Sequence, residues 1–257
     1  MIRNHDARLF ATVGACLIFA AAVFGQTDEI QVYDASIAAP GKFNLTLHSN
    51  FTPDGRQTPA FPGSIVPDKS FNGVPEWAYG VTEWFEAGLY LPVYSISQGR
   101  GLTFDGFKVR TLFVSPNAAN REFFYGINFE HSYNEKYWDT ARVTSEIRPI
   151  IGWHMHPMDL IFNPIIDTAY NGFKNLDLAP EIRVAYNFSP NWAIGVEEYA
   201  DLGTFGHINS LSRQSHQLFG VVDYAGKAVN VEFGVGFGLT STSDQITLKL
   251  ILSRELN

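Results

Sequence analysis

The chain has 257 residues, a formal net charge of −8 and 14% aromatic residues, whereas only 17% of its residues are charged. This composition excludes a disordered chain, which would be rich in charge and poor in aromatic residues. The acidic balance also argues against nonspecific nucleic-acid binding, which needs clustered Lys and Arg. We therefore expect a folded protein with no nucleic-acid partner, built as one large domain or two small ones.

Residues 1–25 have the three-part layout of a secretory signal peptide. Arg3 and Arg8 give a positive start, an apolar run follows over residues 9–24, and Gly25 is a small residue suited to cleavage. The run is shorter than the ~20 residues that a membrane-spanning helix needs. We predict cleavage near Gly25, with an uncleaved anchor or a lipid anchor at Cys16 as alternatives. Cys16 is the chain's only cysteine, so the cleaved protein would form no disulfide.

Residues 26–41 precede the first clear strand, and we predict an N-terminal periplasmic segment there. The same stretch is compatible with an extra strand or with part of a plug.

Residues 42–257 alternate in polarity with a period of two, which is typical of β-strands. In residues 229–239 every second side chain is apolar, while Asn230, Glu232 and three glycines occupy the positions between. The same reading predicts twelve strands, at residues 42–51, 75–82, 84–95, 102–115, 121–133, 140–153, 158–170, 176–188, 191–203, 214–224, 228–239 and 244–254.

The connections between these strands alternate in length. Every second one is a tight turn, and the longest loop covers residues 52–74. Short turns on one rim and longer loops on the other are typical of outer-membrane barrels, whose apolar band of ~25 Å suits strands of this length. We predict an all-β fold: a single antiparallel up-and-down transmembrane β-barrel of about 12 strands, residues 42–257, in the bacterial outer membrane. Its partners would be outer-membrane lipid, the barrel-assembly machinery and a small-molecule solute.

Alternation alone does not decide which face is outward, because a soluble barrel alternates too. The chain has only seven lysines, although soluble β-proteins use Lys to protect their surfaces and edges. The five tryptophans lie at inferred strand ends, as in an interfacial girdle. We therefore predict that the apolar rows face lipid and that these tryptophans mark the membrane interfaces: Trp77, Trp84, Trp138, Trp153 and Trp192.

One strand fits this register badly. Glu198 falls on the lipid-facing row if Glu197 points inward, so we expect a β-bulge between them.

The inward rows are rich in ionisable groups, and acids outnumber bases. A mesh of ion pairs filling the lumen and a narrow charge-lined pore both fit such a set. In the second case the acid excess favours cations or neutral solutes. The lumen-lining candidates are Glu76, Glu86, Lys108, Arg110, Asn128, Glu130, Glu146, Arg148, Asn163, Asp167, Glu181, Arg183, Glu197, Asp201, Glu232 and Lys249.

Sequence motifs for catalysis are absent: there is no G-x-S-x-G, P-loop, G-x-G-x-x-G or H-E-x-x-H. The glycines of residues 234–238 lie on a strand, where they would let bulky lumen side chains pack closely. His154 and His156 have a spacing that could clip a metal, but no acidic or thiol partner has a diagnostic spacing. We therefore predict no catalytic residue, no metal and no cofactor.

A hydrolase built on such a barrel would need a Ser and a His together on the outer face. The local pairs are His131–Ser132 and Ser215–His216. Neighbours in a strand face opposite ways, so neither pair should meet.

Two hairpins resemble outer-membrane proteins grouped under the meta-pathway phenol-degradation label. Residues 76–92 combine a strand, a short Thr-acid-aromatic turn and a Glu-x-Gly-Leu return, and residues 186–193 resemble a later hairpin of the same kind. The resemblance covers most of the mature chain. It implies an outer-membrane barrel and, by its label, uptake of aromatic compounds, and it carries over no catalytic residue.

The predicted function is a narrow pore or transporter for small solutes, hydrophobic or aromatic ones included. Two alternatives stay open. One is a barrel closed by its lumen mesh, with a structural or surface-interaction role carried by the 52–74 loop. The other is a soluble secreted β-protein with its apolar rows inside.

Overall fold

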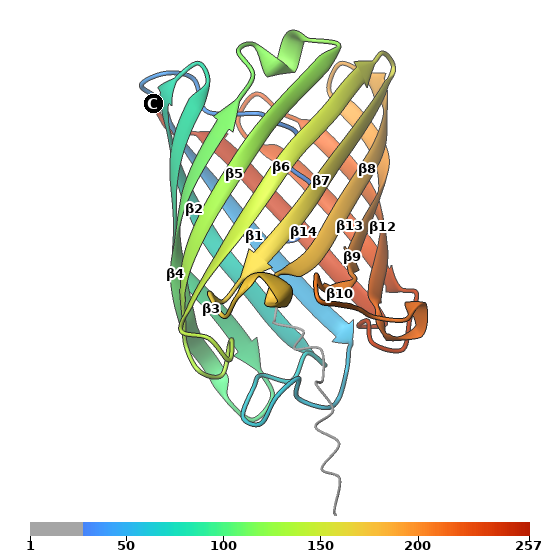
Figure 1. Ribbon diagram of the computed structural model, residues 1–257. Helices are drawn as coiled ribbons and strands as arrows, with labels where there is room; N and C mark the ends of the chain where they lie inside the picture. Colours follow the sequence, from blue (N-terminus) through green and yellow to red (C-terminus); the bar gives the residue numbers. More distant parts are fainter. Residues whose placement is uncertain (1–27) are drawn as a thin grey trace, which may run out of the picture.

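The computed structural model describes residues 28–257 and shows a closed antiparallel β-barrel (Figure 1). The predicted signal peptide and Cys16 lie outside the described residues. Closure comes from pairing of the first and last strands, β1 with β14. The barrel strands are β1 (Phe43–Asp54), β2 (Ser70–Thr82), β3 (Phe85–Ser97), β4 (Gly101–Val114), β5 (Phe123–Asn134), β6 (Val143–Met155), β7 (Met158–Thr168), β8 (Asp177–Ser189), β9 (Trp192–Asp201), β12 (Ser215–Ala225), β13 (Asn230–Gly238) and β14 (Ile246–Glu255).

These twelve strands confirm the predicted fold class and match the predicted segments closely. The main difference is β2, which begins at Ser70 instead of residue 75. Gly73 and Pro75 resemble loop residues in the sequence, and the pairing register with β3 does shift between Gly73 and Glu76. No helix in residues 28–257 has the length and apolarity needed to cross a bilayer.

The connections give the barrel two different ends. At the upper end in Figure 1, two-residue turns join β2 to β3, β6 to β7 and β8 to β9. We call this the short-turn end; the C-terminus lies there, and so does the β4–β5 connection with the 3-10 helix η1 (Ala118–Asn120). The opposite, long-loop end carries η2 (Phe173–Asn175), β10 (Gly203–Thr204), β11 (His207–Ile208) and η3 (Leu211–Arg213).

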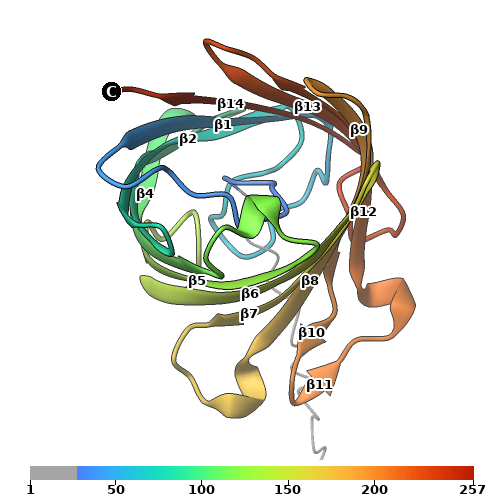
Figure 2. The same ribbon diagram turned by 90° about the horizontal axis from the view of Figure 1, so that it is seen from above.

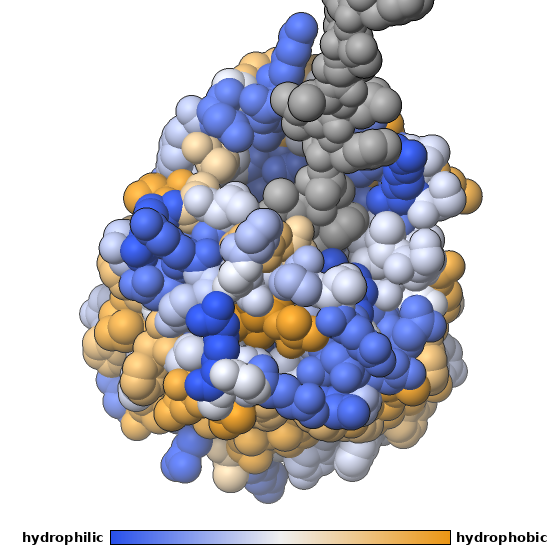
Figure 3. Space-filling view, turned by 90° about the horizontal axis from the view of Figure 1, so that it is seen from below, coloured by the Kyte–Doolittle hydropathy of each residue, from blue (hydrophilic) through white to orange (hydrophobic). Residues whose placement is uncertain are grey.

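The apolar rows face outward. On β4, for example, Phe104 is 62% exposed and Val109 44%, whereas the residue that follows each of them, Asp105 and Arg110, is buried. Figure 3, which looks at the long-loop end, shows hydrophobic residues around the flanks and hydrophilic ones gathered at the loops. Such an exterior suits lipid. The alternative of a soluble protein with these rows as its core is therefore wrong.

Three of the five tryptophans lie at one end of the barrel. Trp84, Trp153 and Trp192 are at the short-turn end, and each packs on an aromatic neighbour from another strand: Trp84 on Phe113 at 6.2 Å, Trp153 on Phe123 at 5.3 Å and Trp192 on Tyr224 at 4.7 Å between ring centroids. This clustering is compatible with the predicted interfacial girdle.

The predicted places of the other two tryptophans are wrong. Trp77 lies in the middle of β2, because that strand begins earlier than expected. Trp138 is only 5% exposed, since the β5–β6 loop folds into the mouth of the barrel and packs it against Ile65 and Tyr90.

The glycine-rich stretch of β13 does let bulky lumen side chains approach, as predicted. A Cβ atom at Gly236 would lie 2.3 Å from the ring of Phe219, and one at Gly234 would lie 2.8 Å from Cε of Lys249.

Replacing Gly236 by valine should therefore lower the free energy of unfolding by about 1–3 kcal/mol, because the fully buried Phe219 ring has to move. The matched control is Gly220→Val on β12, where an added Cβ meets nothing within 4 Å. Urea titration of both variants in lipid vesicles measures the difference. Equal unfolding midpoints for the two variants would contradict this account of the packing.

Candidate functional site

Residues 28–38, which we call the lumen segment, run through the inside of the barrel; Figure 2 shows the chain crossing the interior before it enters β1. Tyr33 donates its backbone N–H to Oδ1 of Asn163 at 2.7 Å, and Nδ2 of Asn163 donates back to the Tyr33 carbonyl at 3.1 Å. Arg148 donates to the Gln31 carbonyl at 2.7 Å. These contacts place residues 28–38 inside the barrel, which matches the plug alternative rather than the predicted periplasmic segment, because lumen side chains bind their backbone.

The segment leaves the lumen at the short-turn end against Gly80. The Gly41 N–H donates to the Gly80 carbonyl at 2.7 Å, and the Gly80 N–H donates to the Lys42 carbonyl at 3.0 Å. A Cβ at Gly80 would lie 2.2 Å from the Ala38 carbonyl oxygen. Glycine thus allows the segment to lie directly on the barrel wall.

An apolar cluster fills the lumen near the short-turn end. Val32, Tyr33 and Ala35 of the lumen segment pack there against inward side chains of the wall and against Ala118 of η1. Figure 2 shows η1 lying over this opening. The wall residues are Leu112, Val114, Phe124, Ile150 and Ile161. Apart from the Tyr33 hydroxyl these side chains offer water no polar partner, and we call this cluster the apolar seal.

A belt of ion pairs lies next to this apolar seal. Arg110 binds the carboxylates of Glu76 and Glu86, and Nε2 of His48 lies 3.1 Å from Glu76. The side chains of all four residues are at most 7% exposed. Each buried charge therefore has an opposite charge beside it.

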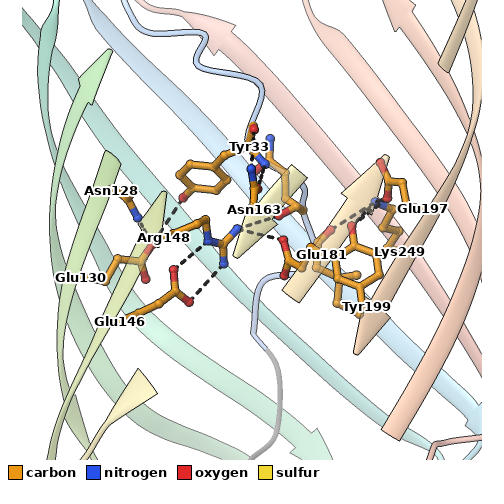
Figure 4. Close-up of polar contacts among 12 residues, drawn as sticks. Tyr33, Asn128, Glu130, Glu146, Arg148, Asn163, Glu181, Glu197, Tyr199 and Lys249 are labelled. Atoms are coloured by element: carbon orange, nitrogen blue, oxygen red, sulfur yellow. Dashed lines mark hydrogen bonds and ion pairs between the residues drawn. The ribbon is translucent and has the colours of Figure 1, made fainter. Parts of the chain in front are cut away.

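Arg148 is the centre of a second group (Figure 4). Its guanidinium donates to both oxygens of Glu146 at 2.7 and 3.1 Å, and Glu181 lies 3.4 Å away. The Tyr33 ring stacks on the guanidinium with 4.4 Å to the ring centroid. This group fixes the lumen segment to β6 and β8 through charge-assisted hydrogen bonds and a cation–π contact.

A third group joins β8, β9, β13 and β14. Lys249 and Arg183 both bind Glu197 and Glu232, and Lys249 also donates to the Ile30 carbonyl at 3.3 Å. Arg183 pairs in addition with Asp223 of β12. The sequence did not reveal Asp223, because β12 has apolar residues on both faces: its inward Phe219 and Val221 pack on Ile30.

The predicted lumen residues all lie on the inward rows. Lys108 binds Asp28 at 2.8 Å and lies 3.6 Å from Glu130, which accepts from Asn128 at 2.9 Å. Asp167 and Asp201 join no ion pair among the described residues and instead line a cavity. The sequence did not reveal seven further polar residues of the lumen. Three of them belong to the lumen segment and four are inward residues of the strands: Asp28, Glu29, Tyr33, His48, Tyr90, Tyr199 and Asp223.

The cavity is a vestibule of about 760 Å³ at the long-loop end. Asp28 and Glu29 of the lumen segment lie at its floor, and residues of the β1–β2, β5–β6 and β7–β8 loops line it. The lumen thus has three layers between the two ends: the apolar seal, the ion-pair belt and the vestibule.

Two polar pairs lie on the outer face near the long-loop end. His131 does not meet Ser132, but its Nδ1 lies 2.6 Å from Oγ of Ser145 on the neighbouring strand, which also bonds Tyr170. Glu198 lies 2.7 Å from Nδ1 of His216. The predicted bulge between Glu197 and Glu198 is wrong, since the β9–β12 register is continuous and the His216 contact satisfies Glu198.

His154 has an acidic neighbour that its spacing in the sequence did not indicate. Its Nδ1 lies 2.7 Å from Oδ1 of Asp159 in the β6–β7 hairpin. Within residues 28–257, no group of three or more His, Cys, Asp or Glu side chains could hold a metal ion.

Comparisons with known proteins agree with the barrel. No protein-family model and no curated protein matches the chain. Among solved structures, the COG4313 outer membrane channel from Pseudomonas putida F1 matches with a TM-score of 0.59 and 12% identity, over 89% of this chain and 100% of that one. The NanC porin matches with a TM-score of 0.54 and 6% identity, over 83% and 100% of the two chains.

A third match is the KdgM porin, solved in complex with disordered oligogalacturonate. Its TM-score is 0.53 and its identity 10%, over 83% of this chain and 99% of that one. The chain therefore has a fold that it shares with outer-membrane channels and porins.

Proposed function

We propose that the protein is a channel of the bacterial outer membrane through which small solutes pass. The observation that carries the proposal is an apolar exterior around a polar lumen with a vestibule of about 760 Å³ at one end. Lipid contacts the exterior, and the barrel-assembly machinery inserts the chain after secretion and removal of residues 1–25. The shared fold with outer-membrane channels supports this function.

The lumen lining favours polar solutes. Resemblance to the meta-pathway phenol-degradation proteins suggests aromatic cargo, whereas the vestibule is lined mainly by carboxylate, amide and hydroxyl groups. Oligogalacturonate, present in the KdgM structure, is a polyanion. An acid surplus in the vestibule disfavours a cargo of that charge.

A barrel closed along its whole length is the second candidate. It is supported by the apolar seal and by the ion-pair belt, which together fill the lumen between the vestibule and the short-turn end. In that case the protein has a structural or surface-interaction role.

Cell fractionation and planar-bilayer recording test the proposal. We expect recovery in the outer membrane, a gel mobility that shifts on boiling, and discrete small current steps. Outer-membrane recovery without any current step, at any voltage, would favour the closed barrel. Recovery in the soluble fraction would contradict both candidates.

A further inference from the structure

The vestibule carries a large surplus of negative charge. Its walls include ten carboxylates and three basic side chains. Each base is already bound to an acid: Arg56 to Asp244 at 3.1 Å, Lys108 to Asp28 at 2.8 Å, and Arg148 to Glu146 and Glu181. The other acids of the lining include several with no cation beside them within residues 28–257.

Glu29 is one of these acids. It is only 6% exposed, it lines the vestibule, and its Oε1 atom has no hydrogen-bond partner within residues 28–257. Beside it, Oδ2 of Asp28 is also buried, and no residue of the described part of the chain bonds it. A buried carboxylate oxygen with no donor costs free energy, so such a group marks a place where a ligand can supply the missing donor.

Three acids of the vestibule wall lie side by side on neighbouring strands. Glu146 of β6 lies opposite Asp167 of β7, and Asp167 lies opposite Asp177 of β8. Directly opposed residues in antiparallel strands have Cβ atoms about 4.5–5.5 Å apart. Arg148 binds Glu146, while Asp167 and Asp177 have no ion pair among the described residues. Two adjacent acids therefore share one uncompensated patch.

Organic ammonium groups fit this lining better than a bare metal ion. The described residues contain no cluster of His, Cys, Asp or Glu suited to chelating a metal. The aromatic rings of Trp138 and Tyr199 line the same cavity, and aromatic faces attract ammonium groups. A volume of about 760 Å³ is within the range of small-molecule sites.

We propose that the vestibule is a binding site for small organic dications, namely primary diamines. The ammonium groups neutralise Glu29 at the floor and the Asp167–Asp177 pair on the wall, and the amide and hydroxyl side chains around them accept the remaining N–H donors. The inference deepens the proposed channel function by naming the solute class, but binding itself does not require conduction.

Calorimetric titration of the purified protein in detergent at low salt tests the site. The probe is 1,5-diaminopentane, compared with 1-aminopentane, pentanedioate and magnesium chloride. We expect saturable binding of the diamine, weaker binding of the monoamine and none of the dianion. Rising salt should weaken diamine binding, because the contacts are ionic.

Two variants locate the site. Glu29→Gln, and separately Asp167→Asn with Asp177→Asn, should each weaken diamine binding by roughly tenfold or more, since an amide oxygen still accepts from the ammonium group but supplies no negative charge. The matched control is Glu83→Gln, which removes the same charge from the exposed β2–β3 turn at the opposite end and should leave binding unchanged. A mobility shift on boiling shows that each variant is folded. Glu29 is on no strand, so its replacement leaves the barrel pairing intact.

The proposal is overturned if the diamine does not bind, if it binds no tighter than the monoamine, or if both vestibule variants bind it as the unaltered protein does. Tighter binding of magnesium, with displacement of the diamine, would overturn it in favour of an inorganic cation site. Diamine binding by a protein that never conducts would refute the channel function and leave this inference standing.

Discussion

Replacing Arg110 by alanine should lower the free energy of unfolding by about 3–5 kcal/mol, the range found when one partner of a buried ion pair is removed. Arg110 is 5% exposed and is the cation that holds both Glu76 and Glu86. Without it, two carboxylates stay inside the barrel with only His48 near Glu76 and the Ala38 N–H on Glu86. The loss of stability is large because the two carboxylates remain shielded from water and no longer have a cation that compensates for their lost hydration.

Urea titration of the protein in lipid vesicles measures the loss. Arg142→Ala is the matched control: Arg142 binds Glu135 at 2.9 Å, but both side chains are more than a third exposed, so its replacement should cost no more than about 1 kcal/mol. A triple variant, Arg110→Met with Glu76→Gln and Glu86→Gln, should regain much of the lost stability. Equal effects of Arg110→Ala and Arg142→Ala would show that the buried charges matter no more than surface ones.

The strands were predictable because their signal is local. Alternation between lumen and lipid repeats every two residues along each strand, so the outward Val231, Phe233 and Val235 identify β13 without any knowledge of its neighbours. The same alternation placed Lys249 and Arg183 inside. The predicted β2 was too short because Gly73 and Pro75 interrupt the alternation of polar and apolar residues, although backbone pairing with β1 continues through both residues.

Contacts between distant parts of the chain carry no such signal. Tyr33 meets Asn163 across 130 positions of sequence, and nothing in residues 28–38 alone predicts that backbone pairing. Trp138 was predicted to lie at the membrane interface. Its burial results from the way two loops fold together, and the sequence does not show that packing. The sequence does contain one sign that the lumen is filled. Inward apolar residues such as Leu112 and Phe219 lie on strands whose outward rows are apolar too, which indicates that apolar groups pack beside them in the lumen.

For the proposed channel, the layered lumen predicts that the lumen segment decides conduction. The vestibule is open at the long-loop end, and the wall of a barrel of this size leaves space unless something fills it. In the apolar seal, Val32, Tyr33 and Ala35 of the lumen segment fill that space between the wall and η1. The closed end therefore depends on a part of the chain that is not a barrel strand.

Deleting residues 28–38 should raise the single-channel conductance severalfold. The deletion removes the apolar core of the seal and opens a water path from the vestibule to the short-turn end. The barrel should still form, because Arg148 loses the Gln31 carbonyl and the Tyr33 ring, Lys249 loses the Ile30 carbonyl, and both keep their carboxylate partners on the wall. All strand pairing lies outside the deleted residues.

Planar-bilayer recording of the deletion variant measures the rise, after a mobility shift on boiling has shown that the variant is folded. Asp34→Ala is the control, since Asp34 is an exposed residue of the same segment that bonds only the nearby Ser36 N–H, and its conductance should equal that of the unaltered protein. A folded deletion variant that conducts no better would place the closure in the ion-pair belt instead. In that case Arg148, which reaches from β6 to the lumen segment and binds acids of β6 and β8, would be the next side chain to replace.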